Sequence, residues 1–528
     1  MFFTCILLRI VMLSKIHSAG LSGLEGYHVS VEVDEGDGLP RSVIVGNVSP
    51  SVREALERCQ VALKNSSVFL PPKRLTINLA PADRRKDGTF FDLAILSGVL
   101  KAIYMPAGAD TDQYGFIGEV GLDGEIRHVN GILSLVSALK EEGLRGAIVP
   151  QADVQEALVV ENMDIIGISH VTELFKLLRS EDAFNMFDRP IPEKSLQDEQ
   201  AYEADFSDVH GQSFGIRAAL IAAAGGHNLL LSGVAGSGKT MIAKRIPSIL
   251  PPLTREENIE VTRVYSASGL LPKGQALYNR RPFRTPHHTI TTPALIGGSS
   301  PQGIMPGEIA LATRGVLFLD EIPLFSRFAI EALREPMEEK RVVINRLQGS
   351  FTYPADCMVV AAMNPCPCGY YPDRNRCHCT EAEIRAYQKG ISRPILERID
   401  LCVEASPVRF EEAVSLEKGI SSRELREKVQ DAREIQKIRF KNTDIMTNAE
   451  MRIRHIHTFC KLGSREEEFI GDVFRLRGLS MRSYHKILKV ARTIADLEHA
   501  EKINISHLSE AVSYRGLEDR LFGGGDMA

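Results

Sequence analysis

The chain has 528 residues, too many for one hydrophobic core, and this length predicts about three domains of ordinary size. Its 44% hydrophobic and 25% charged residues exclude a disordered or membrane-embedded protein and are typical of a soluble globular one. A net charge of −5 excludes an overall attraction to nucleic acid, although not a local basic surface. Nine cysteines, four of them clustered, do not fit a disulfide framework and predict a reducing, cytoplasmic compartment.

The two ends of the chain carry no membrane signal. No stretch reaches the ~18–20 apolar residues of a membrane-spanning helix, so we expect no membrane partner. The apolar segment 1–13 lacks a basic start and a cleavage site, which argues against a signal peptide. Met12 is an alternative start, which would make 1–11 an upstream extension; a short packed strand is the other interpretation of that segment.

Residues 12–180 are predicted to form one α/β domain. Alternating apolar runs predict strands, a 3.6-residue apolar period predicts helices, and Asp123-Gly124 predicts a hairpin turn. A polar, acidic linker is predicted at 181–204. The predicted strands are 29–33, 42–48, 74–79 and 146–149, the helices are 51–65, 91–104 and 132–142, and the hairpin is 118–127.

The next segment fits the P-loop pattern GxxxxGK[ST], with a predicted strand at 227–232 before it and a helix at 241–250 after it. Glycines let backbone N–H groups curl around phosphates, and a helix N-terminus favours an anion. We therefore expect ATP here, with Lys239 at the β- and γ-phosphates and the Thr240 hydroxyl on Mg²⁺. The predicted nucleotide-binding residues of this loop are Gly233, Gly236, Ser237, Gly238, Lys239 and Thr240.

Two later apolar runs, 316–319 and 358–363, fit buried parallel strands that end in polar residues. The carboxyl ends of such strands are where α/β sheets bind ligands. We expect Asp320 to hold Mg²⁺ through water, Glu321 to polarise the attacking water, and Asn364 to contact the γ-phosphate or that water. Structural roles are the alternative, including an amide that only caps the following turn.

Four cysteines form two C-x-C pairs between 366 and 379. Four thiols in this form suit tetrahedral Zn²⁺, and reduced cysteines packed in a loop are the alternative. His378 is expected to face solvent. The predicted zinc ligands are Cys366, Cys368, Cys377 and Cys379.

The C-terminal part, 406–522, is predicted to be helical, with a flexible tail at 523–528. Its basic residues are predicted to form a solvated helical face, with a subunit contact or DNA binding as alternatives. The predicted helices are 411–436, 452–461, 464–475, 481–500 and 506–514, and the basic residues are Arg475, Arg477, Lys486, Lys489 and Arg492.

Several blocks carry a resemblance to a known family. Arg281-Pro-Phe-Arg-Thr-Pro-His-His-Thr289, followed by Gly297-Gly298 and Pro306-Gly-Glu308, resembles the magnesium-chelatase-like ATPases. Residues 38–46, 77–83 and 118–127 resemble the Lon-protease-type domain that opens the ComM/YifB family. The chain is similar to that family over nearly its whole length. The resemblance implies a Lon-type α/β domain, an AAA+ core of parallel sheet with helices on both faces at 205–405, an insertion at 264–306, and a helical lid.

The resemblance also implies functional residues outside the P-loop. Asn364 matches sensor 1, Arg398 lies in a motif that resembles an arginine finger, and Arg482 lies in one that resembles sensor 2. An arginine finger acts on the nucleotide site of a neighbouring subunit, so the subunits must form a ring. The resemblance implies that this ring is a homo-hexamer. The basic residues of the insertion would face the pore or an entering strand and neutralise its phosphates. The alternative is that they only stabilise the structure of the insertion. These residues are Arg280, Arg281, Arg284, His287 and His288.

The Lon-like domain lacks the residues of a protease. Residues 88–93 correspond to the region where Lon carries its catalytic serine, and residues 130–133 to the region of its catalytic lysine. Neither the serine nor the lysine is present there. Ser97 and Lys101, four residues apart on a predicted helix, are interpreted as an incidental pair. The domain is therefore predicted to be non-proteolytic.

The function implied by the resemblance is a hexameric ATPase that moves along single-stranded or branched DNA. Such a motor promotes branch migration in recombination, especially during natural transformation. A protein-remodelling ATPase, like the motor subunit of magnesium chelatase, is the alternative, and an ATP-dependent protease is disfavoured by the missing residues. Stimulation of ATP hydrolysis by DNA separates the first function from the others.

Overall fold

The computed structural model describes the chain as two compact units. The first comprises Met1–Asp198, Asn258–Tyr278 and Asn345–Thr352, and the second comprises the remainder. The upstream extension, most of the linker and the tail lie outside the described residues. The described residues are 13–36, 38–104, 110–179, 202, 204–272, 274–300, 303–346, 349–405 and 419–516.

A seven-stranded mixed sheet organises the N-terminal unit, in the order β3-β4-β2-β1-β5-β8-β9. β1 and β2 form an antiparallel hairpin, and β2 pairs antiparallel with β4, which pairs parallel with the edge strand β3. The predicted hairpin at 118–127 is confirmed as β6 and β7. The strands are β1 (Ser14–Ser22), β2 (Glu25–Gly36), β3 (Arg41–Val45), β4 (Arg74–Ala80), β5 (Tyr114–Phe116), β6 (Glu119–Val120), β7 (Ile126–Arg127), β8 (Gly146–Pro150) and β9 (Asp164–Ile168).

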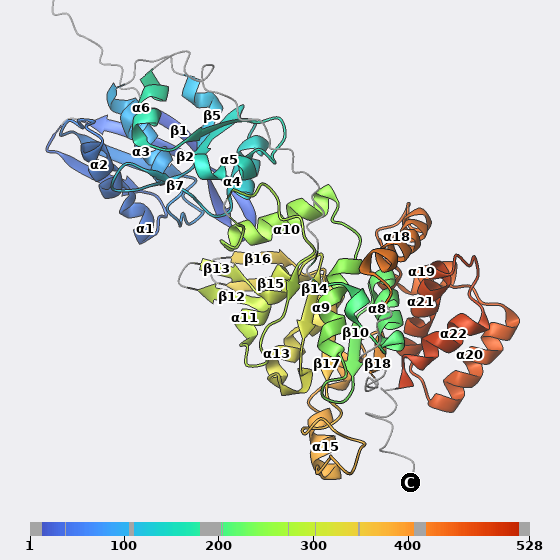
Figure 1. The fold of residues 1–528 in the computed structure, drawn as a ribbon. Coiled ribbons are helices and arrows are strands. Elements are labelled where there is room, and N and C mark those ends of the chain that lie inside the picture. The colour runs from blue at the N-terminus through green and yellow to red at the C-terminus, as the bar shows by residue number, and fades with distance from the viewer. Residues whose placement is uncertain are drawn as a thin grey trace, which may run out of the picture. The chain divides into compact units, whose positions relative to one another are not determined.

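Helices cover both faces of this sheet, as an α/β domain requires (Figure 1). One buried cluster joins the sheet to α2, α3 and α6, and a second joins it to α4 and α5. The predicted α/β fold is thus confirmed. The helices are α1 (Pro50–Arg53), α2 (Ala55–Asn65), α3 (Asp92–Tyr104), α4 (Ile132–Glu141), α5 (Val154–Ala157) and α6 (Val171–Arg179).

The segment Asn258–Tyr278 meets a buried carboxylate of the N-terminal unit. Ser266 Oγ donates a hydrogen bond to Glu156 Oε1 at 2.6 Å and accepts one from the Gly131 N–H at 2.9 Å. The Leu133 N–H also donates to Glu156 Oε1, at 2.9 Å. Burial raises the pKa of Glu156 to about 7, although the hydrogen bonds from Ser266 and Leu133 oppose the shift. Part of a chain segment that follows the P-loop in sequence is therefore anchored in the first unit.

A five-stranded parallel sheet in the order β11-β14-β17-β10-β18 forms the centre of the second unit (Figure 1). β17 lies between β10 and β14, so the carboxyl ends of these three strands are adjacent. β11 falls inside the predicted insertion at 264–306, so this part of the insertion belongs to the core sheet. The strands are β10 (Leu229–Ser232), β11 (Phe283–Arg284), β14 (Val316–Leu319), β17 (Met358–Met363) and β18 (Leu401–Glu404).

Continuous apolar runs explain why these strands are central. All four residues of β14 and all six of β17 are buried, because helices cover both faces of the sheet. The hairpin of β12 (Gly297–Ser300) with β13 (Gly303–Pro306) accompanies it. A second hairpin, β15 (Arg341–Arg346) with β16 (Gly349–Pro354), has its Asn345–Thr352 part in the first unit. The helices of this unit are α8 (Ser213–Gly225), α9 (Lys239–Ile249), α11 (Thr292–Ile296), α12 (Glu308–Leu311), α13 (Arg327–Ala332), α14 (Arg334–Glu339), α15 (Glu381–Gln388) and α16 (Arg393–Leu396); α10 (Arg255–Ala267) belongs to the first unit from Asn258 on.

The C-terminal helices pack against the core through α8 and α9, and they share one hydrophobic cluster with it. Lys486 on α21 forms a salt bridge of 2.9 Å with Asp400, and Arg492 forms one of 3.1 Å with Asp496. The prediction of a solvated basic face was wrong for Lys486 and Arg492, which are buried beside their carboxylate partners; Arg475 and Arg477 are exposed. The helices are α18 (Ser422–Arg439), α19 (Ile453–Phe459), α20 (Ser464–Arg477), α21 (Met481–Leu497) and α22 (Ile505–Ser513).

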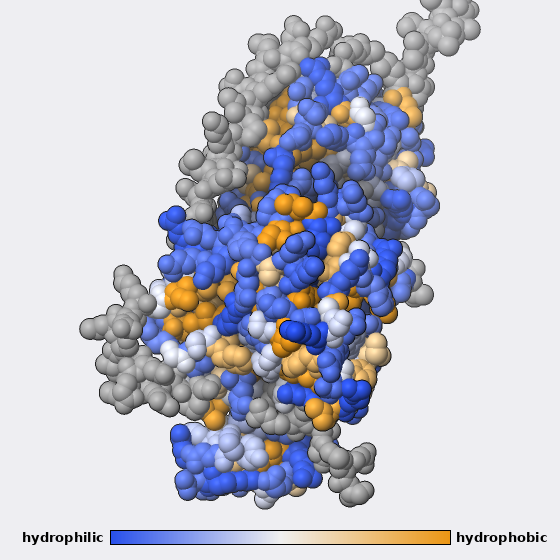
Figure 2. Space-filling model, turned by 90° about the vertical axis from the view of Figure 1, so that its right-hand side faces the viewer, coloured by the Kyte–Doolittle hydropathy of each residue, from blue (hydrophilic) through white to orange (hydrophobic). Residues whose placement is uncertain are grey.

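None of the helices among the described residues combines the length and apolar character that crossing a membrane requires. Figure 2 shows hydrophilic residues over most of one face, with apolar residues in separate small groups.

Candidate functional site

The predicted P-loop joins the end of β10 to the start of α9. Gly236 and Gly238 have φ of 77° and 81°, in the left-handed region that favours glycine. Gly238 is the N-cap of α9 and supplies no side-chain cap. Among the described residues, the backbone N–H groups of Gly238, Lys239 and Thr240 have no protein acceptor. The loop therefore presents unpaired donors at a helix N-terminus, which is the arrangement that binds phosphate.

The Lys239 ammonium lies over this loop. Its Nζ donates to the carbonyls of Gly233 at 2.7 Å and Val234 at 2.9 Å, and to Asn364 Oδ1 at 3.2 Å. Burial lowers the pKa of Lys239, while the charges of Asp320 and Glu321 act in the opposite direction. The predicted P-loop lysine and the predicted sensor asparagine are thus in direct contact.

The two predicted magnesium residues also meet. Thr240 Oγ1 donates to Asp320 Oδ2 at 3.1 Å, across the gap between α9 and the end of β14. The Glu321 N–H donates to Asp320 Oδ1 at 3.0 Å, and Glu321 has a φ of 53°. A left-handed φ at a non-glycine residue is strained, and such strain is often found at functional sites.

Tyr387 on α15 is a site residue that the sequence analysis missed. The Asn364 N–H donates to its hydroxyl, which lies near the carboxylates of Glu321 and Asp320. Burial raises the pKa of Tyr387 to about 12, so the phenol stays protonated. No sequence motif marks this tyrosine; it reaches the strand end because α15, the short helix after the cysteine loop, carries it there.

The four cysteines converge as predicted. Their Sγ atoms all lie within 4.8 Å of one another, and the Cys366 Sγ is 3.3 Å from Cys368 Sγ and 3.7 Å from Cys377 Sγ. A tetrahedral Zn²⁺ with bonds of about 2.3 Å places its sulfurs about 3.8 Å apart, so the spacing fits zinc. His378 is exposed, as expected.

The cysteine loop, residues 366–379, contacts the P-loop directly. The Ala235 N–H donates to the carbonyl of Gly369 at 3.1 Å. Gly369 has a φ of 82°, and a Cβ there would lie 3.2 Å from Ala235 Cβ. The close approach therefore requires glycine. Figure 1 shows α15, which follows this loop, projecting from the body of the second unit.

Arg398 and Arg482 come together on one carboxylate rather than on the P-loop. Arg398 Nη2 lies 2.8 Å from Glu338 Oε1, and Arg482 binds the same oxygen. Arg482 also lies 3.7 Å from Glu397. Burial alone would raise the pKa of Glu338, but the hydrogen bonds from Arg398 and Arg482 outweigh it and hold that pKa below its ordinary value. We call these four side chains the Glu338 cluster.

Two arginines of the resemblance block have structural partners. Arg281 donates to the carbonyls of Pro251 and Arg314 at 2.8 Å each and forms a salt bridge with Glu257 at 2.9 Å. Arg284 binds both oxygens of Glu308 at 2.6 and 2.7 Å. The idea that these two side chains neutralise phosphates is therefore wrong for the described fold, since each charge is already paired. Arg280 and His287 are exposed.

The N-terminal unit contains no Ser–Lys pair at Ser97 and Lys101. Ser97 Oγ donates to the Leu93 carbonyl at 2.7 Å, whereas Lys101 binds Thr111 and Asp112, each at 2.7 Å. The incidental interpretation of this pair is confirmed.

Comparisons with known proteins agree with this geometry. Residues 31–153 match the family described as subunit ChlI of Mg-chelatase, 205–413 match magnesium chelatase, subunit ChlI, and 419–515 match its C-terminal family. The chain is 38% identical over 510 residues to YifB of Escherichia coli, an uncharacterized protein, with 96% of this chain and 98% of that protein covered. It is 36% identical over 510 residues to competence protein ComM of Haemophilus influenzae, with the same coverage.

The chain belongs to the ComM/YifB family of magnesium-chelatase-like AAA+ proteins. A relative from Mycobacterium tuberculosis, also uncharacterized, is 35% identical over 503 residues, with 95% of this chain and 98% of that protein covered. The similarity to ComM and YifB spans both units.

The ComM/YifB family implies ATP and Mg²⁺, and the residues present fit both. The unpaired N–H groups of the P-loop suit phosphate oxygens. The Thr240 hydroxyl and the Asp320 carboxylate, 3.1 Å apart, offer the oxygen ligands that Mg²⁺ prefers. We take these residues as those that would hold the nucleotide and its metal.

Proposed function

We propose that this chain is a Mg²⁺-dependent ATPase that forms a homo-hexameric ring and moves along single-stranded or branched DNA. The observation that carries the proposal is the convergence of the P-loop, Asp320, Glu321 and Asn364 at the carboxyl edge of three adjacent parallel strands. Phosphoryl transfer depends on positioning and charge stabilisation, and each of these groups has a position from which it can contribute.

The roles follow from the contacts. Lys239 would exchange its bonds to the Gly233 and Val234 carbonyls for bonds to the β- and γ-phosphates. Thr240 and Asp320 would orient the metal, and bound Mg²⁺ supplies neutralisation of charge on the phosphate oxygens. Glu321 would accept a proton from the attacking water, while the side-chain amide of Asn364, a residue whose backbone N–H donates to the Tyr387 hydroxyl, would orient that water.

A ring is supported by where Arg398 lies. In the single chain its guanidinium is held by Glu338 and by the carbonyls of Arg334 and Pro394. No P-loop residue is among the partners of Arg398 in the described part of the chain. An arginine that completes a neighbouring subunit's site is expected to lie away from its own P-loop.

Action on DNA is supported by the relative in Haemophilus influenzae, whose name is competence protein ComM. Competence concerns the uptake of DNA, and branch migration during recombination is the step at which a ring motor would act. We propose the same role for this chain, in a reducing cytoplasm. A protein-remodelling ATPase would show the same nucleotide chemistry without any dependence on DNA.

The experiment is ATP hydrolysis by purified protein with and without single-stranded and branched DNA. We expect DNA to stimulate turnover and a labelled junction to be resolved in an ATP-dependent way. Glu321→Gln is the control that binds ATP without turning it over. Robust hydrolysis that is indifferent to every DNA would refute the DNA motor and leave the ATPase, and normal turnover by Glu321→Gln would refute the assigned site.

We also propose that the cysteine loop binds structural Zn²⁺. Besides the sulfur spacing, the Tyr371 N–H donates to Cys366 Sγ at 3.4 Å, a contact that would orient a thiolate ligand. Cys366, Cys377 and Ile384 form a small apolar cluster around the site. Metal analysis of protein purified without added zinc should give one Zn²⁺ per chain, and its absence together with failure to bind added Zn²⁺ would refute the site.

A further inference from the structure

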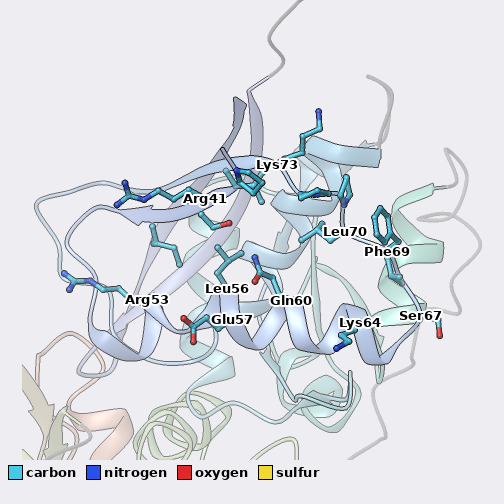
Figure 3. Close-up of a pocket in the computed structure, with 17 residues that line it drawn as sticks. Arg41, Arg53, Leu56, Glu57, Gln60, Lys64, Ser67, Phe69, Leu70 and Lys73 are labelled. Carbon is cyan, nitrogen blue, oxygen red and sulfur yellow. The ribbon is translucent and has the colours of Figure 1, made fainter. Parts of the chain in front are cut away.

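A cavity in the N-terminal unit is lined by none of the residues assigned to the ATPase site. Its volume is about 880 Å³, and it opens between the edge strand β3, the helix α2 and the segment 67–73 (Figure 3). We call it the β3 groove. It exists because β3 is the last strand of the sheet, so α2 has no further strand to pack against on that side.

The floor of the β3 groove is aliphatic. Ser42 and Ile44 alternate with the exposed Val43 and Val45, so one face of β3 is turned into the groove and the other away from it. The remaining aliphatic lining comes from α2, β4 and the segment 67–73. Those side chains are Leu56, Val68, Leu70 and Leu75.

The rim is cationic. Arg41 and Lys73 border one side, and Arg53 and Lys64 border the other, beside a single carboxylate, Glu57 (Figure 3). Four cations against one carboxylate give a local charge of +3 on a chain whose net charge is −5. The groove is thus a basic concavity on an acidic protein, which favours an anionic ligand.

Among the described residues, three of these four cations have no carboxylate partner. Lys73 binds Glu35 at 2.6 Å, but within the described residues Arg41, Arg53 and Lys64 have no carboxylate partner. By contrast, Arg58 on the same helix as Lys64 binds the buried Asp92 at 2.8 Å. The arginine that faces the core is paired, and the three cations that face the groove are available to a ligand.

We propose that the β3 groove binds an extended acidic segment of a partner protein that also carries bulky aliphatic side chains. The edge of β3 offers backbone N–H and C=O groups to an added strand, and alternate side chains of that strand would enter the aliphatic floor. Carboxylates on the intervening positions would meet the cationic rim. All of these contacts lie in one unit and involve no residue of the ATPase site.

The composition of the groove favours a peptide over nucleic acid. Single-stranded nucleic acid is held by aromatic side chains on which bases stack. Phe69 is the sole aromatic residue in the lining and is 74% exposed at one end of the groove. A floor of leucine, isoleucine and valine instead matches aliphatic side chains.

The test is fluorescence anisotropy on the full chain without nucleotide, using a short labelled peptide that alternates aspartate and leucine. The wild-type chain should bind it, and Arg53→Ala/Lys64→Ala should weaken binding roughly tenfold, since two exposed cations are lost. Both residues are exposed, so the substitutions leave the core intact. The matched control is Lys140→Ala/Lys176→Ala, which removes two exposed cations from α4 and α6 and should bind like the wild type.

A second variant and two probes separate the other outcomes. Ile44→Ala should weaken the aspartate–leucine peptide but not a peptide of aspartate and glycine, which would show that the floor takes part. No binding by the wild type, or equal binding by Arg53→Ala/Lys64→Ala, would overturn the proposal. An oligothymidine that binds the wild type and displaces the peptide from it would also overturn the proposal and assign the groove to nucleic acid.

Discussion

Replacement of Cys368 by serine tests whether the cysteine loop supports the nucleotide site. Cys368 is the exposed member of the four thiols, so serine removes one zinc ligand with little change in packing. Without the metal, the loop that carries Gly369 loses its cross-link, and the hydrogen bond from the Ala235 N–H to the Gly369 carbonyl is no longer held. A hydrogen bond of this kind contributes about 0.5–1.5 kcal/mol, so we expect ATP affinity to fall roughly 2- to 12-fold.

The assay pairs metal content with titration of a fluorescent ATP analogue. Cys59→Ser is the matched control, because Cys59 lies in the N-terminal unit outside the thiol cluster. It should retain zinc and full nucleotide affinity. Complete loss of zinc from Cys368→Ser with unchanged affinity would refute the coupling between the loop and the P-loop.

Three further outcomes are expected. Lys239→Ala should abolish ATP binding without changing the melting temperature greatly, whereas Lys244→Ala, an exposed lysine on the same helix, should bind normally. Subunits with Arg398→Ala mixed with Lys239→Ala subunits should regain part of the ATPase activity, and no rescue at any ratio would contradict a finger in trans. Glu156→Gln should flatten the pH dependence of stability: burial raises the pKa of Glu156 to about 7, so its contribution is present below about pH 4.5 and is lost as pH rises through 7, by roughly 3 kcal/mol at most. Thermal unfolding from pH 5 to 8 measures this, and equal slopes for both proteins would contradict it.

The parts of the site that the sequence predicts are those encoded by local pattern. Glycine is favoured where φ is positive, as at Gly236 and Gly238, and a four-residue apolar run before Asp320 fits a buried strand. Because the carboxyl ends of parallel strands meet at one edge, the contact between Thr240 and Asp320 follows from the motifs once the sheet is parallel. Local sequence patterns are therefore enough to predict the residues at the centre of the nucleotide site.

The parts that the sequence did not predict depend on tertiary partners. Lys486 and Arg492 look like solvent-exposed charges on a helix, and they are buried only because Asp400 and Asp496 lie opposite them. Arg281 likewise looks available until the carbonyls of Pro251 and Arg314 are placed around it. A charge pattern along one segment carries no information about the acceptor that the fold brings to it.

The Glu338 cluster bears on how an arginine could serve a neighbouring subunit. The Glu338 side chain is 46% exposed and that of Arg398 only 9%, so water can partly compensate the carboxylate when one cation leaves it. Glu338 has two partners, so withdrawal of Arg398 would leave it paired with Arg482, which also lies 3.7 Å from Glu397. The shared carboxylate thus lowers the free energy needed to release Arg398 toward a phosphate in an adjacent subunit. Arg482→Ala should therefore hinder the action of Arg398 in trans by leaving it as the only cation on Glu338, an effect that a purely local role for Arg482 in its own subunit would not produce.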